Sequence, residues 1–230
     1  MFQPGGPSFL ELLQQCFSST CRGYDLLAPK FDKTPFRTPE EVLTKIASFL
    51  QPVTDSLDLC CGTGAGLQML DPLTQGRLAG LDCSPQMLAV ARHAIPRAEL
   101  IQGDVLTMNF SGAFDLISSF GAFGHIRPHQ EARFVRLVWH ALRPGGRFVF
   151  VTAYSPEPTS ARFWRSHLFN AAMHTRNFFW RPPFIMYYLT FLLPYCKGML
   201  EAHGFAVIER PGLFADDLRD LVFVEAIRPF

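Results

Sequence analysis

The chain has 230 residues, of which 48% are hydrophobic and 18% are charged, and its formal net charge is +1. That length suits one α/β domain with an added segment. No block of like charges appears, which excludes the basic stripe that holds nucleic-acid phosphates, so we expect a small-molecule partner and no nucleic acid.

The first 50 residues predict a helical arm. Phe9–Phe17 has the pattern of a short amphipathic helix. The run Thr38-Pro-Glu-Glu41 predicts a second helix start, with Thr38 as its N-cap and Glu41 closing a capping box. Apolar residues from Val42 onward then repeat along one face, so this helix is expected to pack on the sheet.

A strand over Ser56–Cys60 ends in a glycine-rich loop that contains Gly62 and Gly64, and a helix over Ala65–Leu70 follows. Glycines let backbone N–H groups approach a ligand that a Cβ would hold away. The start of the helix adds a partial positive charge at the same place. The stretch therefore predicts a ligand-binding loop.

A second strand, over Gly76–Asp82, ends in an acid 18 residues beyond Gly64. An acid at this spacing from a glycine loop is placed to accept hydrogen bonds from ribose hydroxyls, which indicates a nucleoside-bearing cofactor. Leu67 stands where the dinucleotide fingerprint has its third glycine. This departure disfavours nicotinamide binding and leaves a nicotinamide-dependent oxidoreductase as a minor alternative.

The remaining elements alternate. Ser84-Pro85 starts a helix that runs to Ala94, and strands are predicted over Glu99–Gln102, Phe114–Ser119 and Arg147–Ala153, with a helix over Pro128–Leu142 before the last of them. A helical end follows over Lys197–His203, and the last two strands are Phe205–Arg210 and Leu221–Ile227. Alternation predicts a parallel sheet with right-handed crossovers and a ligand site beyond the carboxyl ends of its strands.

Five stretches carry a resemblance to a known family. They are Leu57–Gly64, Gly80–Leu88, Gln102–Val105, Phe114–Phe120 and Leu142–Val149. In order and spacing they are similar to the motifs of class I S-adenosylmethionine-dependent methyltransferases, over about Tyr24 to Ala153. The resemblance implies a Rossmann-like, seven-stranded, mostly parallel sheet with helices on both faces and an antiparallel last strand.

The resemblance also implies which residues hold S-adenosylmethionine. Gly62 and Gly64 would let the backbone run close to its methionine end, and Asp58 would hold that loop in place. Asp82 would accept hydrogen bonds from the ribose hydroxyls. Asp104 and Val105 would contact the adenine. Ser119 would contact the methionine portion. Met87 would pack on the adenine, although its helical position favours an ordinary core role. Tyr24 would either shield the sulfonium or pack the N-terminal arm. Cys60 and Cys83 lie inside these motifs, and Cys60 stands where the family usually has glycine. Asp115 is expected to be structural.

Methyl transfer needs neither a metal nor a catalytic triad, because the protein mainly positions two partners and excludes water. A general base helps only where the acceptor loses a proton. His125 follows the fourth strand, where the acceptor side should open, and is the first candidate for that base. A structural loop histidine is the equally weighted alternative.

Residues 154–197 form an aromatic-rich insertion, with eleven aromatic residues between Phe163 and Tyr195. Its apolar run Phe184–Cys196 is too short to span a membrane. The insertion can wall a pocket for an apolar or aromatic acceptor, rest on a membrane surface near a lipid such as a quinone precursor, or form a packed cap or dimer contact.

The six cysteines lack the Cys-x-x-Cys spacing of a zinc site, so no metal is expected. Three of them adjoin the ligand motifs, where a disulfide framework would distort the loops. We therefore expect reduced thiols and a cytoplasmic setting, and no signal peptide is evident.

These observations predict a single-domain methyltransferase that acts on a small, apolar or aromatic acceptor. A protein that binds S-adenosylmethionine without transferring its methyl group, and that serves protein–protein contact, is the alternative from another class. The oligomeric state and the methylated atom cannot be read from the sequence.

Overall fold

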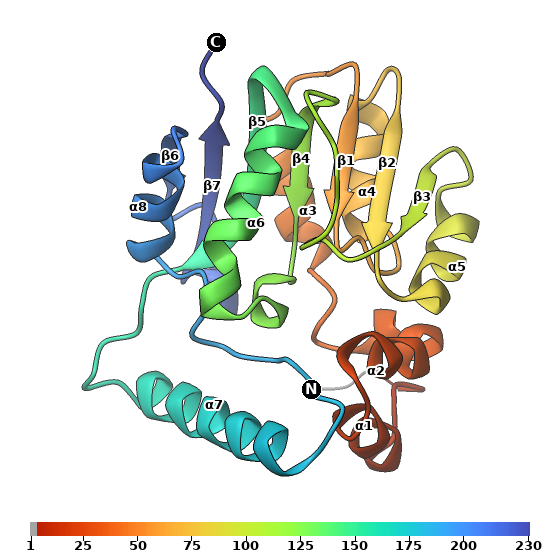
Figure 1. The fold of residues 1–230 in the computed structure, drawn as a ribbon, viewed down its shortest axis with the longest axis vertical. Coiled ribbons are helices and arrows are strands. Elements are labelled where there is room, and N and C mark those ends of the chain that lie inside the picture. The colour runs from red at the N-terminus through yellow and green to blue at the C-terminus, as the bar shows by residue number, and fades with distance from the viewer. Residues whose placement is uncertain (1–3) are drawn as a thin grey trace.

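The computed structural model describes residues 4–230 and contains one seven-stranded sheet flanked by helices (Figure 1). The strands are β1 (Ser56–Leu59), β2 (Leu78–Asp82), β3 (Glu99–Gln102), β4 (Phe114–Ser119), β5 (Leu142–Ala153), β6 (Ala206–Arg210) and β7 (Leu221–Ile227). The helices are α1 (Phe9–Cys16), α2 (Thr20–Leu27), α3 (Glu40–Ala47), α4 (Ala65–Leu70), α5 (Pro85–Ala94), α6 (Pro128–Ala141), α7 (Ala161–Phe179) and α8 (Tyr195–Ala202). Residues 1–3 of the predicted arm lie outside the described part.

The strand order is β3-β2-β1-β4-β5-β7-β6, and β7 runs antiparallel between β5 and β6. This confirms the predicted Rossmann-like sheet with its antiparallel last strand. The order reverses between β1 and β4, which lie side by side. A crevice forms at that reversal, beyond the carboxyl ends of the parallel strands.

Both faces of the sheet are covered, because alternate residues of each strand point to opposite sides. Leu57 and Leu59 belong to the core under α6 and α8, together with Phe148 and Phe150 of β5. Val149 packs instead into the core under α3, α4 and α5. In Figure 1, α1, α2 and α7 lie below these two layers, beyond the carboxyl ends of the parallel strands.

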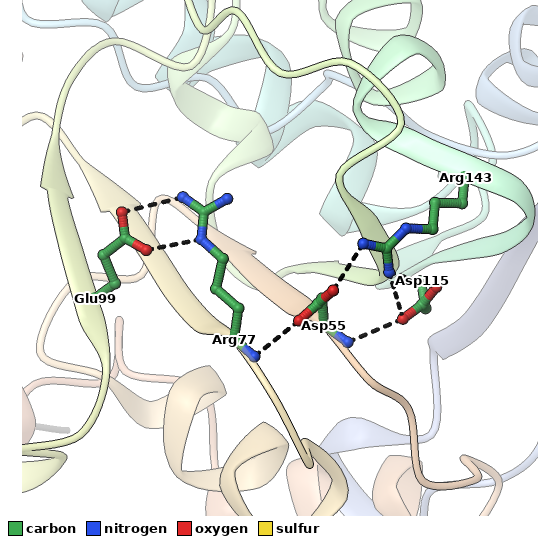
Figure 2. A network of polar contacts seen from close by, with 5 residues as sticks. All are labelled: Asp55, Arg77, Glu99, Asp115 and Arg143. Carbon is green, nitrogen blue, oxygen red and sulfur yellow. Dashed lines mark hydrogen bonds and ion pairs between the residues drawn. The ribbon is translucent and has the colours of Figure 1, made fainter.

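A network of charged side chains joins the opposite, amino ends of five strands (Figure 2). Arg143 contacts Asp55 at 2.7 Å and Asp115 at 2.9 Å, and Asp115 accepts a hydrogen bond from the Asp55 N–H. Arg77 donates its backbone N–H to Asp55 and pairs with Glu99. Asp115 therefore has the structural role expected of it.

Two local predictions are wrong. Pro39, not Thr38, is the N-cap of α3, and no side chain caps this helix. Thr38 lies one residue too early for its hydroxyl to reach the first free amides. The fifth strand, predicted from Arg147, begins at Leu142, so Arg143–Gly146 between the predicted helix and strand belong to β5, with an irregularity in the pairing to β4 before Arg147.

The expectation of six reduced thiols is also wrong. Cys21 of α2 and Cys83, directly after β2, form a disulfide, while the other four cysteines are free. The sequence could not show that the N-terminal arm folds back onto the loop after β2. The cytoplasmic setting was inferred from reduced cysteines, so it loses that support and stays a prediction.

The predicted aromatic insertion consists of α7 and an extended segment over 180–194. Met173 of α7 packs with Phe184, Ile185 and Tyr187, and Tyr24 of α2 adds to this small core. Within residues 4–230, no helix is long and apolar enough to cross a membrane.

Candidate functional site

The glycine loop after β1 turns sharply through residues with left-handed backbone angles. Cys60, Gly62 and Gly64 have φ values of 56°, 52° and 96°. Gly64 is the N-cap of α4, and a Cβ there would lie 2.7 Å from the Ile95 side chain. A Cβ on Gly62 would meet nothing within 4 Å, because this residue faces an open cavity.

Cys60 takes a left-handed conformation that costs a residue with a Cβ about 1–2 kcal/mol. Its side chain lines the cavity, so the departure from glycine narrows the space beside the loop without removing it. Burial raises the pKa of the Cys60 thiol well above its ordinary range, and the nearby Asp82 carboxylate adds to that rise. The thiol therefore stays protonated at neutral pH.

Asp82 lies at the carboxyl end of β2 with its carboxylate fixed by backbone amides. Gly62 donates its N–H to Oδ2 at 2.9 Å, and Ser84 donates its N–H to Oδ1 at 2.8 Å. Burial raises the pKa of Asp82, and these N–H groups oppose the rise. Each oxygen keeps a second lone pair, so the carboxylate can still accept from two hydroxyls.

Three of the predicted cofactor residues lie behind the loop and not on the cavity wall: Asp58, Gly64 and Ser119. Ser118 donates its hydroxyl to Asp58 Oδ1 at 2.6 Å, and Ser119 donates to the Leu59 carbonyl at 3.2 Å. The Asp58 carboxyl occupies the space where a Cβ on Gly66 would be. Burial raises the pKa of Asp58 to about 7, although the Ser118 hydrogen bond lowers it.

A cavity of about 720 Å³ opens between the carboxyl ends of the parallel strands and the segments that cover them. The other predicted site residues line it: Tyr24, Cys60, Gly62, Asp82, Cys83, Met87, Asp104, Val105 and His125. Asp104 accepts the Leu106 N–H on Oδ1 at 2.8 Å, which leaves Oδ2 for a ligand. The structure thus gathers residues from β2, the loops after β1 and β3, and the N-terminal arm around one space.

His125 and Tyr24 meet in the lining of this cavity. The His125 ring lies 2.5 Å from the Ile185 carbonyl through Nδ1 and 2.8 Å from the Tyr24 hydroxyl through Nε2. A carbonyl only accepts, so Nδ1 carries the proton and the Tyr24 hydroxyl donates to Nε2. Burial lowers the pKa of His125 and raises that of Tyr24, so both groups are neutral near pH 7.

Several lining residues were not predicted. Cys21 and Thr38 enter the wall from the N-terminal arm, and Tyr187, Tyr188 and Thr190 enter it from the segment after α7. The aromatic composition of that segment was the signal for the two tyrosines. No pattern in the sequence links the Ile185 carbonyl to His125, because the contact joins a backbone atom to a side chain 60 residues away.

A family model described as "Methyltransferase domain" matches residues 57–146. The match includes the glycine loop, Asp82 and Asp104, which lie around the cavity. These residues therefore match a methyltransferase domain. The resemblance drawn from the sequence motifs is thereby confirmed.

Two relatives are similar to part of this chain. An uncharacterized methyltransferase of Synechocystis, sll0829, is 33% identical over 116 residues, which are 50% of this chain and 53% of the relative. The dTDP-3-amino-3,4,6-trideoxy-alpha-D-glucopyranose N,N-dimethyltransferase of Streptomyces venezuelae is 31% identical over 146 residues, 62% of this chain and 60% of that protein. The chain thus spans little more than half the length of these relatives.

Among solved structures, the complex of DhpI with SAH aligns with 96% of this chain and 99% of its own. The TM-score is 0.67 and the sequence identity is 18%, so this likeness shows the methyltransferase fold alone.

Proposed function

We propose that this protein is an S-adenosylmethionine-dependent methyltransferase that acts on a small, apolar or aromatic acceptor. The observation that carries the proposal is that two groups of residues line the same cavity. Asp82, Asp104, His125 and the Gly62 loop come from the strands and the loops that follow them, and Tyr24 and the tyrosines after α7 come from the segments that cover these loops. A volume of about 720 Å³ is large enough for a nucleoside and a small acceptor together.

The residues fit the cofactor by shape and by chemistry. An open space above Gly62 leaves room for a ligand against the loop, and the Asp82 carboxylate can accept from two vicinal hydroxyls. Asp104 Oδ2 and the Val105 backbone would meet the adenine. When bound, S-adenosylmethionine would supply a methyl group on a sulfonium, which is activated for in-line displacement.

The acceptor class rests on the apolar and aromatic residues of the lining. Phe31, Phe36, Ile185 and Tyr188 line the cavity, so an apolar or aromatic molecule is favoured over a strongly charged one. The Streptomyces relative is named for an amino-sugar nucleotide. The aromatic lining of this chain is the reason for assigning it a different kind of acceptor.

For an acceptor with a hydroxyl, the Tyr24–His125 pair offers a route for the departing proton. The Tyr24 hydroxyl can take the acceptor proton while it passes its own to His125 Nε2, and the Ile185 carbonyl stabilises the imidazolium through Nδ1–H. In this scheme His125 is the base that the sequence predicted, and Tyr24 is a relay and not only a shield.

The test is turnover against pH, measured as S-adenosylhomocysteine formed with a panel of phenols and other apolar hydroxyl compounds. Because burial lowers the pKa of His125, its neutral form persists below the ordinary value of about 6.5, and the acid limb of kcat should fall below that pH. His125→Gln and Tyr24→Phe should each reduce kcat by about 100-fold or more.

Unchanged kcat and an unchanged pH profile in both variants would refute the relay. Wild-type protein that binds S-adenosylmethionine but turns over no acceptor in a broad panel would favour the alternative of a binding protein without transferase activity.

A further inference from the structure

Exposed apolar side chains concentrate on two helices that lie together at one edge of the molecule. Of fifteen large apolar residues exposed in the described part of the chain, nine belong to α1, α7 and the residue that follows each. On α7 they are Trp164, Leu168, Phe178 and Phe179, with Trp180 after the helix, and each is more than half exposed. A soluble surface rarely gathers so many in one place, so this patch needs an explanation.

The outer side of α7 is a regular helical stripe. Trp164, Leu168, Thr175 and Phe179 follow at spacings of four, seven and four residues, which places them on one face. The opposite side packs into the protein through Met173, which is buried. The helix therefore has its apolar packing already, and the outer stripe is not needed for the fold.

The apolar residues of α1 continue this surface. They are Phe9, Leu10, Leu13 and Phe17, and Phe9 and Leu10 are more than half exposed. The Phe17 ring lies 5.3 Å from the Trp180 ring, and Arg176 donates to the Ser18 carbonyl at 3.3 Å. Figure 1 shows α1 and α7 at the same lower edge. We call the nine exposed apolar residues of these two helices and their following positions the α1–α7 face.

The α7 part of the α1–α7 face lies in a segment whose own charges are all positive, whereas α1 carries one acid, Glu11, which pairs with Lys30. Residues 158–200 contain no Asp or Glu but five basic residues, although the net charge of the whole chain is only +1. Arg165 and Arg181 have no acidic partner in the part of the chain that the structure describes. Beside α7 a cavity of about 370 Å³ is lined by Arg162, Arg165, Ser166 and Tyr188. In this lining Arg162 pairs with Asp220 at 2.6 Å, so Arg165 is the guanidinium left to meet an anion such as a phosphate.

We propose that the α1–α7 face binds the surface of a bilayer that contains anionic lipids. Exposed Trp, Phe and Leu beside arginines are the composition of helices that lie in the membrane interface. A second copy of this chain is a poorer partner, because a two-fold contact through the same face would set the positive segments against each other. This inference goes beyond the proposed function and does not require methyl transfer.

The proposed bilayer contact would lie close to segments that line the large cavity. α2, which follows α1, contributes Tyr24 to the cavity wall, and the segment after α7 contributes Ile185 and Tyr188. A bilayer on the α1–α7 face would therefore lie against the segments that cover the acceptor side of the large cavity. An apolar acceptor dissolved in the bilayer would have a short path to it.

The experiment uses the whole chain and the tryptophans it already has. Trp164 and Trp180 belong to the face, whereas Trp139 packs against Phe205 and Arg228 elsewhere. With Trp139→Phe as background, the protein is mixed with vesicles of phosphatidylcholine alone or of phosphatidylcholine and phosphatidylglycerol in equal parts. Co-sedimentation and tryptophan emission are recorded at low and high salt.

The expected result is binding to the anionic vesicles with a blue shift of tryptophan emission, weakened by salt. Leu168→Ser with Phe179→Ser, and Phe9→Ser with Leu10→Ser, should each weaken the partition by about tenfold or more. Arg165→Glu with Arg181→Glu should remove the preference for anionic vesicles. Ile208→Thr, an exposed apolar change on the edge strand β6, is the matched control and should bind as wild type does.

Thermal unfolding confirms that each variant is folded, which is expected because the changed side chains are exposed. No binding of the folded wild type to either vesicle would overturn the proposal. So would a concentration-dependent dimer that shifts the emission of both face tryptophans without vesicles, because a second copy would then be the occupant. Binding of S-adenosylhomocysteine in the same samples reports separately on the proposed function.

Discussion

Gly62 and Gly112 have nearly the same backbone, with φ values of 52° and 53°, and a Cβ on either would meet nothing within 4 Å. Only Gly62 lines the large cavity. Gly62→Ala and Gly112→Ala should therefore each destabilise the fold by a similar amount, about 1 kcal/mol, because of the left-handed angle. Only the first should weaken binding of S-adenosylhomocysteine.

Thermal unfolding and a ligand titration of the two variants make this comparison. Equal affinity in both would mean that the ligand does not lie against Gly62. If Gly112→Ala also lost affinity, the effect would be a general loss of stability.

Asp58 is a residue whose burial should appear in the pH dependence of stability. Its pKa is raised to about 7 by burial, against about 4 in an unfolded chain, so the folded state holds the proton more tightly. This contribution is fully present at low pH and is lost as the pH rises from about 4 through 7. Over that range wild type should lose up to roughly 4 kcal/mol of unfolding free energy relative to Asp58→Asn.

Urea denaturation of the ligand-free proteins at several pH values measures this difference. Parallel stability curves for wild type and Asp58→Asn would show that the carboxyl is not held in a raised-pKa environment.

At the scale of elements, α2 is fastened to the start of α5 in two ways. Cys21 is disulfide-bonded to Cys83, and Asp25 accepts hydrogen bonds from the Ser84 hydroxyl and the Gln86 N–H. The bond closes a loop of 62 residues, so the variant with both Cys21→Ser and Cys83→Ser should lose about 2–4 kcal/mol of unfolding free energy.

Cys16→Ser is the control, because Cys16 lies on the neighbouring helix and is free. Thiol labelling of unreduced, denatured protein should modify four of the six cysteines. Labelling of all six would show that the pair does not form, and the stability difference should then vanish.

The elements that the sequence predicts well are those whose signals are local. The Ser84 cap and Pro85 mark the start of α5, which ends at Ala94 as predicted. The apolar run Leu221–Ile227 is β7, also as predicted. The glycine loop and Asp82 were found because their turn chemistry and spacing lie in the sequence itself. The antiparallel position of the last strand came from family resemblance.

The parts that were missed depend on how distant segments meet. The Cys21–Cys83 bond requires the N-terminal arm to fold back onto the loop after β2, and no periodicity reports this. The Ile185 carbonyl reaches His125 only because the segment after α7 returns across the cavity. Such contacts are set by tertiary packing, so residue patterns could name His125 but not its partners.

At the scale of the whole molecule, ion pairs lie at one end of the sheet and the ligand cavity lies at the other. The charged network of Asp55, Asp115 and Arg143 joins the amino ends of the strands (Figure 2), while the cavity lies beyond their carboxyl ends. Ion pairs link the strands at one end, and loops and covering helices occupy the other end.

The central claim is that the cavity holds an adenosyl cofactor through Asp82. Calorimetric titration of the wild type and of Asp82→Asn with S-adenosylmethionine, S-adenosylhomocysteine and NAD tests it most directly. We predict binding of the two adenosyl ligands and not of NAD, and a loss of about tenfold or more in the variant, because the amide replaces a charged acceptor of ribose hydroxyls. Failure of the folded wild type to bind either adenosyl ligand, or equally tight binding of NAD, would contradict the account.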